Sequence, residues 1–158
     1  MKPQISKASK IINAPADIIY RIIADYRNGH PHILPKPYFL SIDVEEGGYG
    51  AGTIVNFEMR LLWQRQAFHS RITEPKPGRL LVETDLRSGI PTSFHVISTR
   101  NRDESQVTIS TALKGMNLIQ GFVAKKILQK VYHEELELLA KAAEEQAGSA
   151  QPSIFKKA

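Results

Sequence analysis

The side chains best able to move a proton near neutral pH are the five histidines of this 158-residue chain. His30 and His32 form an H-x-H pair in the segment NGHPHILP, where proline and glycine predict a loop. A catalytic zinc ion needs a third protein ligand, and no further motif with metal-binding spacing appears. We therefore predict that both lie exposed in the loop, and that the protein uses no metal and no other cofactor. His69 and His95 fall at outward positions of predicted strands and His133 on a helix surface, so no histidine is assigned a catalytic role.

A glycine-rich segment, GGYGAG at residues 47–52, has the composition of a phosphate-binding loop but not its context. Phosphate loops lead into the N-terminus of a helix, whereas this segment lies between two stretches with the alternation of β-strands. Its spacing is not G-x-G-x-x-G, and no Lys-Ser or Lys-Thr pair follows it. We interpret the segment as a hairpin turn or bulge in which glycine supplies positive φ angles.

The composition narrows the expected partners and compartment. The net charge of +5 is scattered, with no run of five basic side chains, so we expect no nucleic acid partner and leave contact with an anionic membrane surface open. Cysteine is absent, which excludes disulfide bonds, thiolate metal sites and a cysteine nucleophile. The first fifteen residues lack the apolar stretch of a signal peptide, and no segment is apolar enough to span a membrane, so we expect a cytoplasmic protein.

Two segments have the 3.6-residue period of helices. The first begins at Pro15, a residue suited to the first helical turn, and ends near Tyr26. The second follows Gly115 and continues for some thirty residues, which at 1.5 Å per residue spans roughly 45 Å. We expect one domain over residues 4–147 and a flexible tail over residues 148–158.

Between the two helices the period is two, which indicates β-strands with one buried face. Six such segments follow one another, at residues 38–45, 53–61, 64–72, 80–85, 92–99 and 105–113. A further strand is expected before the first helix, around residues 5–12. The sequence thus predicts an α+β fold, with an antiparallel sheet of about seven strands that has one face exposed to solvent.

This order of elements resembles the helix-grip fold of the START-like (SRPBCC) superfamily, which includes Bet v 1-like plant allergens and bacterial polyketide cyclase/dehydrase-like proteins. INAPADIIYRIIADYRNGHPHILP is similar to the opening of that family, GGYGAGTIVNF to its glycine hairpin and ITEPKPGRLLVE to its proline-containing turn. The resemblance covers residues 4 to about 145. It implies a curved sheet wrapped around the long C-terminal helix, an apolar cavity between them, and a loop near the cavity mouth that carries His30 and His32.

Side-chain alternation predicts which residues would line such a cavity. We expect the lining to consist of Tyr38, Leu40, Val55, Phe57, Met59, Phe68, Ser70, Thr92, Phe94, Val96 and Ile109 from the strands and Ile119, Phe122, Val123 and Ile127 from the helix. The same alternation turns further strand residues inward, namely Ile42, Thr53, Gln66, Ile72, Ser98, Val107 and Thr111. An apolar pocket with few polar groups is the usual small-molecule site.

The charged side chains of the predicted sheet fall on its outer face. They are Glu58, Arg60, Arg65, Arg71, Glu83 and Asp85. Opposite charges on neighbouring strands predict cross-strand pairs, each contributing about 0.2–1 kcal/mol. Cavity walls without ionisable side chains argue against acid–base catalysis, which needs such a group beside the substrate.

We therefore expect the chain to bind or transport a hydrophobic small molecule, such as a lipid, an isoprenoid or a polyketide-like aromatic compound. One alternative is a polyketide cyclase/dehydrase-type enzyme that holds a flexible substrate in a reactive conformation. In such an enzyme Tyr38, Ser70, Thr92 or a loop histidine would transfer protons.

A second alternative is a module that contacts a membrane surface or a protein partner. Trp63 lies at a predicted hairpin tip, and Lys125, Lys126 and Lys130 give the long helix a basic side. Salt-sensitive binding to anionic vesicles would distinguish this alternative from a carrier whose chemistry lies inside the fold.

Overall fold

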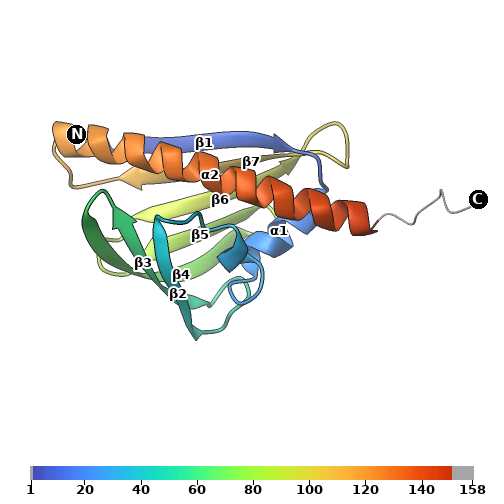
Figure 1. Cartoon of the computed structure of the whole chain (residues 1–158), viewed down its shortest axis with the longest axis horizontal. Helices are drawn as coiled ribbons and strands as arrows, with labels where there is room; N and C mark the ends of the chain where they lie inside the picture. The colour runs from blue at the N-terminus through green and yellow to red at the C-terminus, as the bar shows by residue number, and fades with distance from the viewer. Residues whose placement is uncertain (1, 151–158) are drawn as a thin grey trace, which may run out of the picture.

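A computed structural model describes residues 2–150 of the chain and shows a curved antiparallel sheet with a long helix packed on one face (Figure 1). The elements are β1 (Gln4–Ile12), α1 (Ala16–Ala24), the 3-10 helix η1 (His30–His32), β2 (Phe39–Glu46), β3 (Ile54–Leu61), β4 (Gln64–Lys76), β5 (Leu80–Asp85), β6 (Pro91–Ser98), β7 (Ser105–Leu113) and α2 (Leu118–Ala150). The predicted α+β helix-grip fold is confirmed.

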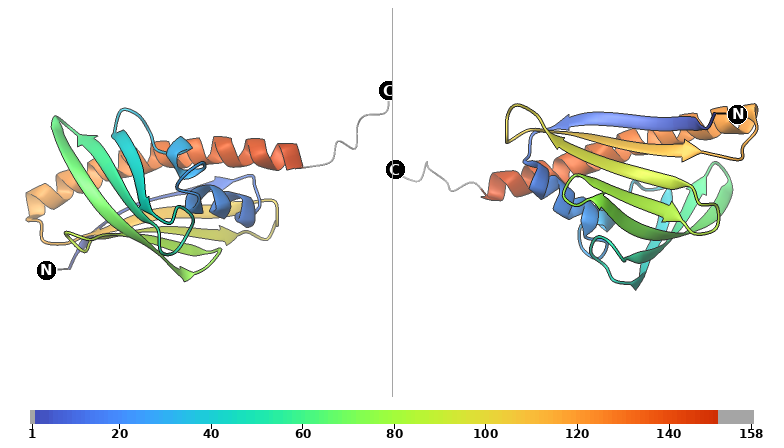
Figure 2. Two further views of the ribbon diagram at one scale, coloured as in Figure 1. Left: turned by 90° about the horizontal axis from the view of Figure 1, so that it is seen from below. Right: turned by 180° about the vertical axis from the view of Figure 1, so that it is seen from behind.

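The sheet has the order β1-β7-β6-β5-β4-β3-β2, and every neighbouring pair is antiparallel. Strands β2 to β7 therefore form a meander, and β1 joins it beside β7. Short turns are sufficient for such a sheet, because antiparallel neighbours need no crossover. The two views of Figure 2 show the sheet curving beneath α2, with the turn between β3 and β4 at the same end of the molecule as the start of α2.

The long helix runs along the edge strand β1, to which its backbone lies closest. The Ser6 hydroxyl donates a hydrogen bond to the Lys125 carbonyl oxygen at 3.0 Å, and the Lys10 ammonium lies 2.9 Å from a Glu137 carboxylate oxygen. At 1.5 Å per residue, the 33 residues of α2 span roughly 50 Å. No helix within residues 2–150 is both long and apolar enough to cross a membrane.

The two halves of α2 differ in burial. The second half packs into the core through Val131, Tyr132, Leu136, Leu139, Ala140 and Ala143. The first half keeps large apolar side chains exposed, namely Leu118, Ile119, Phe122 and Val123. The helix continues through residues 148–150, which the sequence analysis assigned to a flexible tail, and the rest of that tail lies outside the described residues.

The glycine-rich segment at residues 47–52 is the turn between β2 and β3, as predicted, and it also holds the end of α1. The Gly50 N–H donates to the Ala24 carbonyl oxygen at 2.9 Å, and the Tyr26 N–H donates to the Gly48 carbonyl oxygen at 2.9 Å. All four glycines of the segment have positive φ angles, which other residues adopt only at a cost. The segment thus fixes where the chain leaves α1.

The chain then folds back over α1 at Gly29. A Cβ atom at this position would lie 2.6 Å from the Ile22 carbonyl oxygen, a backbone atom that cannot move aside easily. Only glycine fits this close approach, which places the next residue, His30, in the interior, where its side chain is 1% exposed.

The substitution Gly29→Ala should therefore destabilise the fold by about 1–3 kcal/mol, the usual cost of overpacking. Urea denaturation followed by circular dichroism measures this loss. Gly148→Ala is the matched control, because no atom lies within 4 Å of its added Cβ and alanine favours the helix by up to about 1 kcal/mol. Equal stability of the two variants would contradict the close-packing argument.

Candidate functional site

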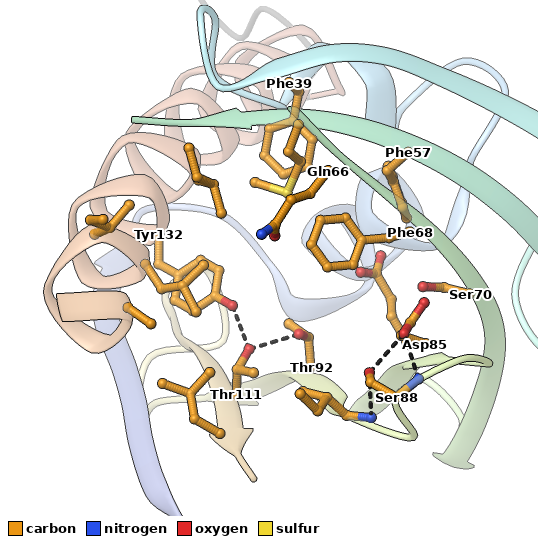
Figure 3. A pocket seen from close by; sticks show the side chains of 18 of the residues that line it. Phe39, Phe57, Gln66, Phe68, Ser70, Asp85, Ser88, Thr92, Thr111 and Tyr132 are labelled. Atoms are coloured by element: carbon orange, nitrogen blue, oxygen red, sulfur yellow. Dashed lines mark hydrogen bonds between the residues drawn. The ribbon is translucent and has the colours of Figure 1, made fainter. Parts of the chain in front are cut away.

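A cavity of about 630 Å³ lies between the sheet and the first half of α2. Its apolar lining is contributed mainly by Leu34, Phe39, Phe57, Met59, Leu61, Phe68, Phe94, Val123, Ile127 and Leu128. Its opening is at the turn between β3 and β4 and at the start of α2, since the lining residues Leu62, Met116 and Ile119 are exposed to solvent there. Figure 3 shows the aromatic side chains of β2, β3 and β4 facing α2 across this space.

Part of the predicted lining faces the cavity. The predicted residues that line it are Phe57, Met59, Phe68, Ser70, Thr92, Phe94, Ile119, Val123 and Ile127, with Gln66 and Thr111 from the further inward set. Val55, Val96 and Ile109 are fully buried in the core and do not line it. Tyr38, Leu40 and Phe122 do not line it either, and the last two are exposed.

A β-bulge explains the error in β2. Phe39 pairs with Met59, but Ser41 pairs with Glu58, so the register shifts by one residue between them. A shift of one residue reverses which side chains face inward. Phe39 consequently lines the cavity, and Leu40, which the alternation placed inside, is 38% exposed.

The prediction that Glu83 and Asp85 lie on the outer face is wrong. Both line the cavity. The register of the sheet explains this, because Glu83 pairs with Thr92 of β6 and Asp85 pairs with Ser70 of β4, and residues directly opposite each other share a face. The argument that the cavity walls lack ionisable groups therefore fails. The outer-face pair of Arg65 and Glu58 does form, at 3.2 Å.

Both oxygens of the Asp85 carboxylate accept hydrogen bonds, from the turn after β5 and from β4. One oxygen accepts hydrogen bonds from the Ser88 N–H at 2.8 Å and the Ser88 hydroxyl at 2.7 Å, and the other accepts from the His69 N–H at 3.1 Å. Burial alone would raise the pKa of Asp85, but these hydrogen bonds and the nearby Arg87 outweigh it and lower the pKa. We therefore assign Asp85 a structural role, holding the turn between β5 and β6 (Figure 3).

His30 is buried, contrary to the prediction of an exposed loop residue. Its Nδ1–H donates to the Ile23 carbonyl oxygen at 2.7 Å, and its ring stacks on Tyr26 with centroids 4.4 Å apart. Burial lowers the pKa of His30 to about 4. The ring is therefore neutral near pH 7, and its Nε2 is a hydrogen-bond acceptor that lies 3.4 Å from the Glu83 carboxyl.

Glu83 is positioned to share a proton with this Nε2. Its carboxyl is 13% exposed and accepts a hydrogen bond from the Tyr26 hydroxyl at 2.6 Å. Burial raises the pKa of Glu83 to about 7, and the bond from Tyr26 offsets only part of that effect. Near neutral pH the carboxyl thus changes its protonation state, which is the property of a group that can accept or donate a proton.

A second carboxyl, Glu135 of α2, lines the same cavity and is 2% exposed. Burial, together with the charge of Glu83, raises the pKa of Glu135 well above its ordinary value. Its Oε1 has no hydrogen-bond partner within residues 2–150. Buried carboxyls are normally paired, because an unmade hydrogen bond costs about 1–3 kcal/mol.

A chain of three hydroxyls crosses the cavity wall from α2 to β6 (Figure 3). The Tyr132 hydroxyl bonds to the Thr111 hydroxyl, which lies 2.7 Å from the Thr92 hydroxyl. Burial raises the pKa of Tyr132 to about 12, so the phenol is neutral at every physiological pH. These hydroxyls, together with Glu83, Glu135 and His30, form what we call the polar end of the cavity.

Within residues 2–150 no three histidine, aspartate or glutamate side chains are grouped as a metal site requires. Sequence reasoning did not place His30, Glu83, Tyr132 and Glu135 in the cavity lining, where the structure has them. Helical spacing could have found two of them, because Tyr132 and Glu135 fall on the stripe formed by Leu136 and Leu139.

The raised pKa of Glu83 predicts how stability depends on pH. The folded protein keeps its proton up to about pH 7, whereas a glutamate ordinarily loses it near 4.5. Its burial should therefore lower the free energy of unfolding as pH rises from about 4.5 to 7, by up to about 3 kcal/mol. Glu83→Gln should gain stability relative to the wild type over this range, as measured by urea denaturation at several pH values.

The lowered pKa of His30 makes the free energy of unfolding rise with pH below pH 6.5, opposite to the effect of Glu83. His30 is present in both the wild type and Glu83→Gln, so its effect cancels when their stabilities are subtracted. A difference between Glu83→Gln and the wild type that does not change with pH would contradict the burial of an ionisable carboxyl at this site.

Comparison with solved structures shows the same fold in several proteins. KanY, solved by NMR, is 24% identical, with a TM-score of 0.80 and coverage of 91% of this chain and 99% of its own. A START superfamily protein from Mycobacterium smegmatis is 14% identical, with a TM-score of 0.64 and coverage of 93% and 99%. A norcoclaurine synthase point mutant from Thalictrum flavum, solved with a transition-state analogue, is 15% identical, with a TM-score of 0.67 and coverage of 90% and 95%.

No curated protein sequence matches the chain. Residues 4–144 match the family described as polyketide cyclase/dehydrase and lipid transport, almost the whole of the described chain. Together with the helix-grip fold, this match shows that the chain belongs to the polyketide cyclase/dehydrase and lipid transport family of the START-like superfamily.

Proposed function

We propose that the chain binds a hydrophobic small molecule in its cavity and carries it, and that it does so in the cytoplasm. The observation that carries this proposal is the cavity itself. Its volume of about 630 Å³ lies within the roughly 300–1,000 Å³ of typical ligand pockets, and most of its lining is aliphatic or aromatic. The family description, which names lipid transport, supports the same conclusion.

The size of the cavity also argues against a packing defect. Protein interiors are close-packed, and an empty cavity costs roughly 24 cal/mol per Å³. At that rate, 630 Å³ of empty core would cost about 15 kcal/mol, which equals the whole stability of a typical domain. A fold that keeps such a space must fill it with solvent or with a ligand, and apolar walls favour the ligand.

Filling the cavity should therefore abolish binding. Ala124 lines it from α2, so Ala124→Trp should lower the affinity for an apolar fluorescent probe such as Nile red at least about tenfold, or about 1.4 kcal/mol. Gln146→Trp places the same side chain on the exposed last turns of α2 and should leave the affinity unchanged. Unchanged binding by a folded Ala124→Trp variant would show that the probe binds elsewhere.

An enzyme of the cyclase/dehydrase type is a second candidate, favoured by a specific observation. Glu83 has a pKa of about 7 and lies beside the neutral His30 ring, so the cavity contains a group that can transfer a proton near neutral pH. Ser70 and Thr92 line the same space and can hydrogen-bond to a substrate. Such an enzyme would release its ligand with altered covalent structure, whereas a carrier returns it unchanged.

Contact with a membrane surface is a third candidate, favoured by the rim of the cavity. Trp63 is 85% exposed at the turn between β3 and β4, and Leu62, Leu118, Ile119 and Phe122 are also exposed there or at the start of α2. Lys114 and Lys126 are exposed on the same part of the chain. Apolar side chains flanked by lysines are suited to an anionic bilayer, from which a carrier would take its ligand.

The double substitution Trp63→Ser and Phe122→Ser should then weaken binding to vesicles of phosphatidylcholine and phosphatidylserine at least about fivefold in a sedimentation assay. The wild type should also release from these vesicles as salt rises, because the lysine contribution is screened. Ile97→Ser, on a strand remote from the rim, is the control for loss of an exposed apolar residue. Vesicle binding that neither salt nor the double substitution changes would exclude this candidate.

A further inference from the structure

The polar end of the cavity has carboxyls but no cation. Its lining includes Glu83, Asp85 and Glu135, and no lysine or arginine is among the lining residues. His30 supplies no positive charge, because its Nδ1–H is taken by the Ile23 carbonyl oxygen and its Nε2 is an acceptor. A carboxylate or phosphate head entering this end would lose its hydration and find no cation to replace it, and leaving an ion unpaired in a water-poor space costs several kcal/mol.

Several hydroxyls at this end are already hydrogen-bonded within the protein. The Tyr26 hydroxyl already donates to Glu83, and the Tyr132 and Thr111 hydroxyls bond to each other. Glu135 contributes an Oε1 that is buried and has no partner within residues 2–150. A ligand group that offers an N–H or O–H donor would satisfy this atom.

The position of Glu135 on α2 gives the direction in which such a ligand would lie. Ile119 is at the cavity mouth, and sixteen helical residues, or roughly 24 Å, separate it from Glu135. The walls between these two points are mainly apolar, with Val123, Ile127 and Leu128 on the helix and Phe57, Phe68 and Phe94 opposite, and Gln66 is among the polar exceptions. The cavity therefore suits an elongated molecule with its polar group at the buried end.

We propose that Glu135 anchors the hydrogen-bond-donating head, an amine or a hydroxyl, of an amphiphilic ligand whose apolar part extends toward the mouth, and that the site rejects anionic heads. This inference rests on the proposed binding function. An ammonium head pairs with the Glu135 carboxylate, and the proton that this carboxyl otherwise holds leaves to solvent. A hydroxyl head donates to the unpartnered oxygen without a change of charge.

Three probes with the same twelve-carbon chain test this inference on the full-length protein. Dodecylamine, dodecan-1-ol and dodecanoate are each titrated at pH 7 against protein loaded with Nile red, which reports occupancy of the cavity. The amine or the alcohol should displace Nile red at a concentration at least about tenfold lower than dodecanoate does. Displacement of Nile red by dodecanoate at a concentration equal to or lower than that of the amine and the alcohol would overturn the inference. This comparison uses the wild-type protein alone.

The substitution Glu135→Gln distinguishes how the ammonium and hydroxyl head groups bind. The variant keeps the size of the side chain and removes its ability to carry a negative charge. It should therefore weaken the binding of dodecylamine at least about tenfold and the binding of dodecan-1-ol less than about threefold. Glu145→Gln on the exposed end of α2 is the matched control and should change neither. Unchanged binding of both the amine and the alcohol in a folded Glu135→Gln variant would remove Glu135 as the anchor.

The proposed binding function fails separately from this inference. If Nile red and all three probes fail to bind, the cavity is not a ligand site and both proposals are wrong. If Nile red binds but the three heads compete equally, the cavity binds ligands and only the role of Glu135 is wrong.

Discussion

The site depends on how α2 packs along its length. Contacts with β1, among them the hydrogen bond from Ser6 to Lys125 and the ion pair of Lys10 and Glu137, hold the helix over one edge of the sheet. Its second half is buried against α1 and the core. Its first half has no such layer beneath it, and the sheet from β3 to β5 curves away on the other side (Figure 1). A straight helix on a curved sheet leaves a space at one end, and that space is the cavity.

The buried end of the cavity carries most of its chemistry. The loop after α1 brings His30 under the sheet because Gly29 allows the chain to pass close to Ile22. Tyr26, His30 and Glu83 then form a connected group, and Glu135 lies on the helix at the same end. Burying two carboxyls without a cation is costly, so each stays protonated to a higher pH than usual. Buried carboxyls with raised pKa values lower the stability of a fold, and they are typical of sites that bind a ligand or transfer a proton.

The fold could be predicted from the sequence because the helix signals, the strand alternation and the turn residues all indicated the same order of elements. The helix signal at Pro15, the six alternating segments and the long final helix all correspond to elements of the structure. The glycine-rich segment was interpreted correctly from its position between two strands. Pairing between strands was not available from one sequence, and the errors in the site follow from that. The bulge at Phe39–Ser41 displaced the predicted lining of β2, and the placement of Glu83 required the register with β4 and β6.

His30 and Glu135 were missed for a different reason. A histidine in a proline-containing loop and an acidic residue in a helix are usually exposed in folded proteins. Their burial depends on tertiary contacts, since η1 packs under the sheet and α2 turns Tyr132 and Glu135 toward the cavity. Local pattern predicts helices and strands, whereas the burial of a single polar side chain is set by tertiary contacts that the pattern does not contain.

The most direct test of ligand binding is to record mass spectra of the purified protein under native and denaturing conditions. If the cavity is a ligand site, we expect a non-covalent adduct that is lost on denaturation, with a mass that identifies an amphiphile bearing an amine or hydroxyl group. Absence of any adduct, together with failure of apolar amines, alcohols and aromatic compounds to form one when added, would contradict the claim that the cavity is a binding site.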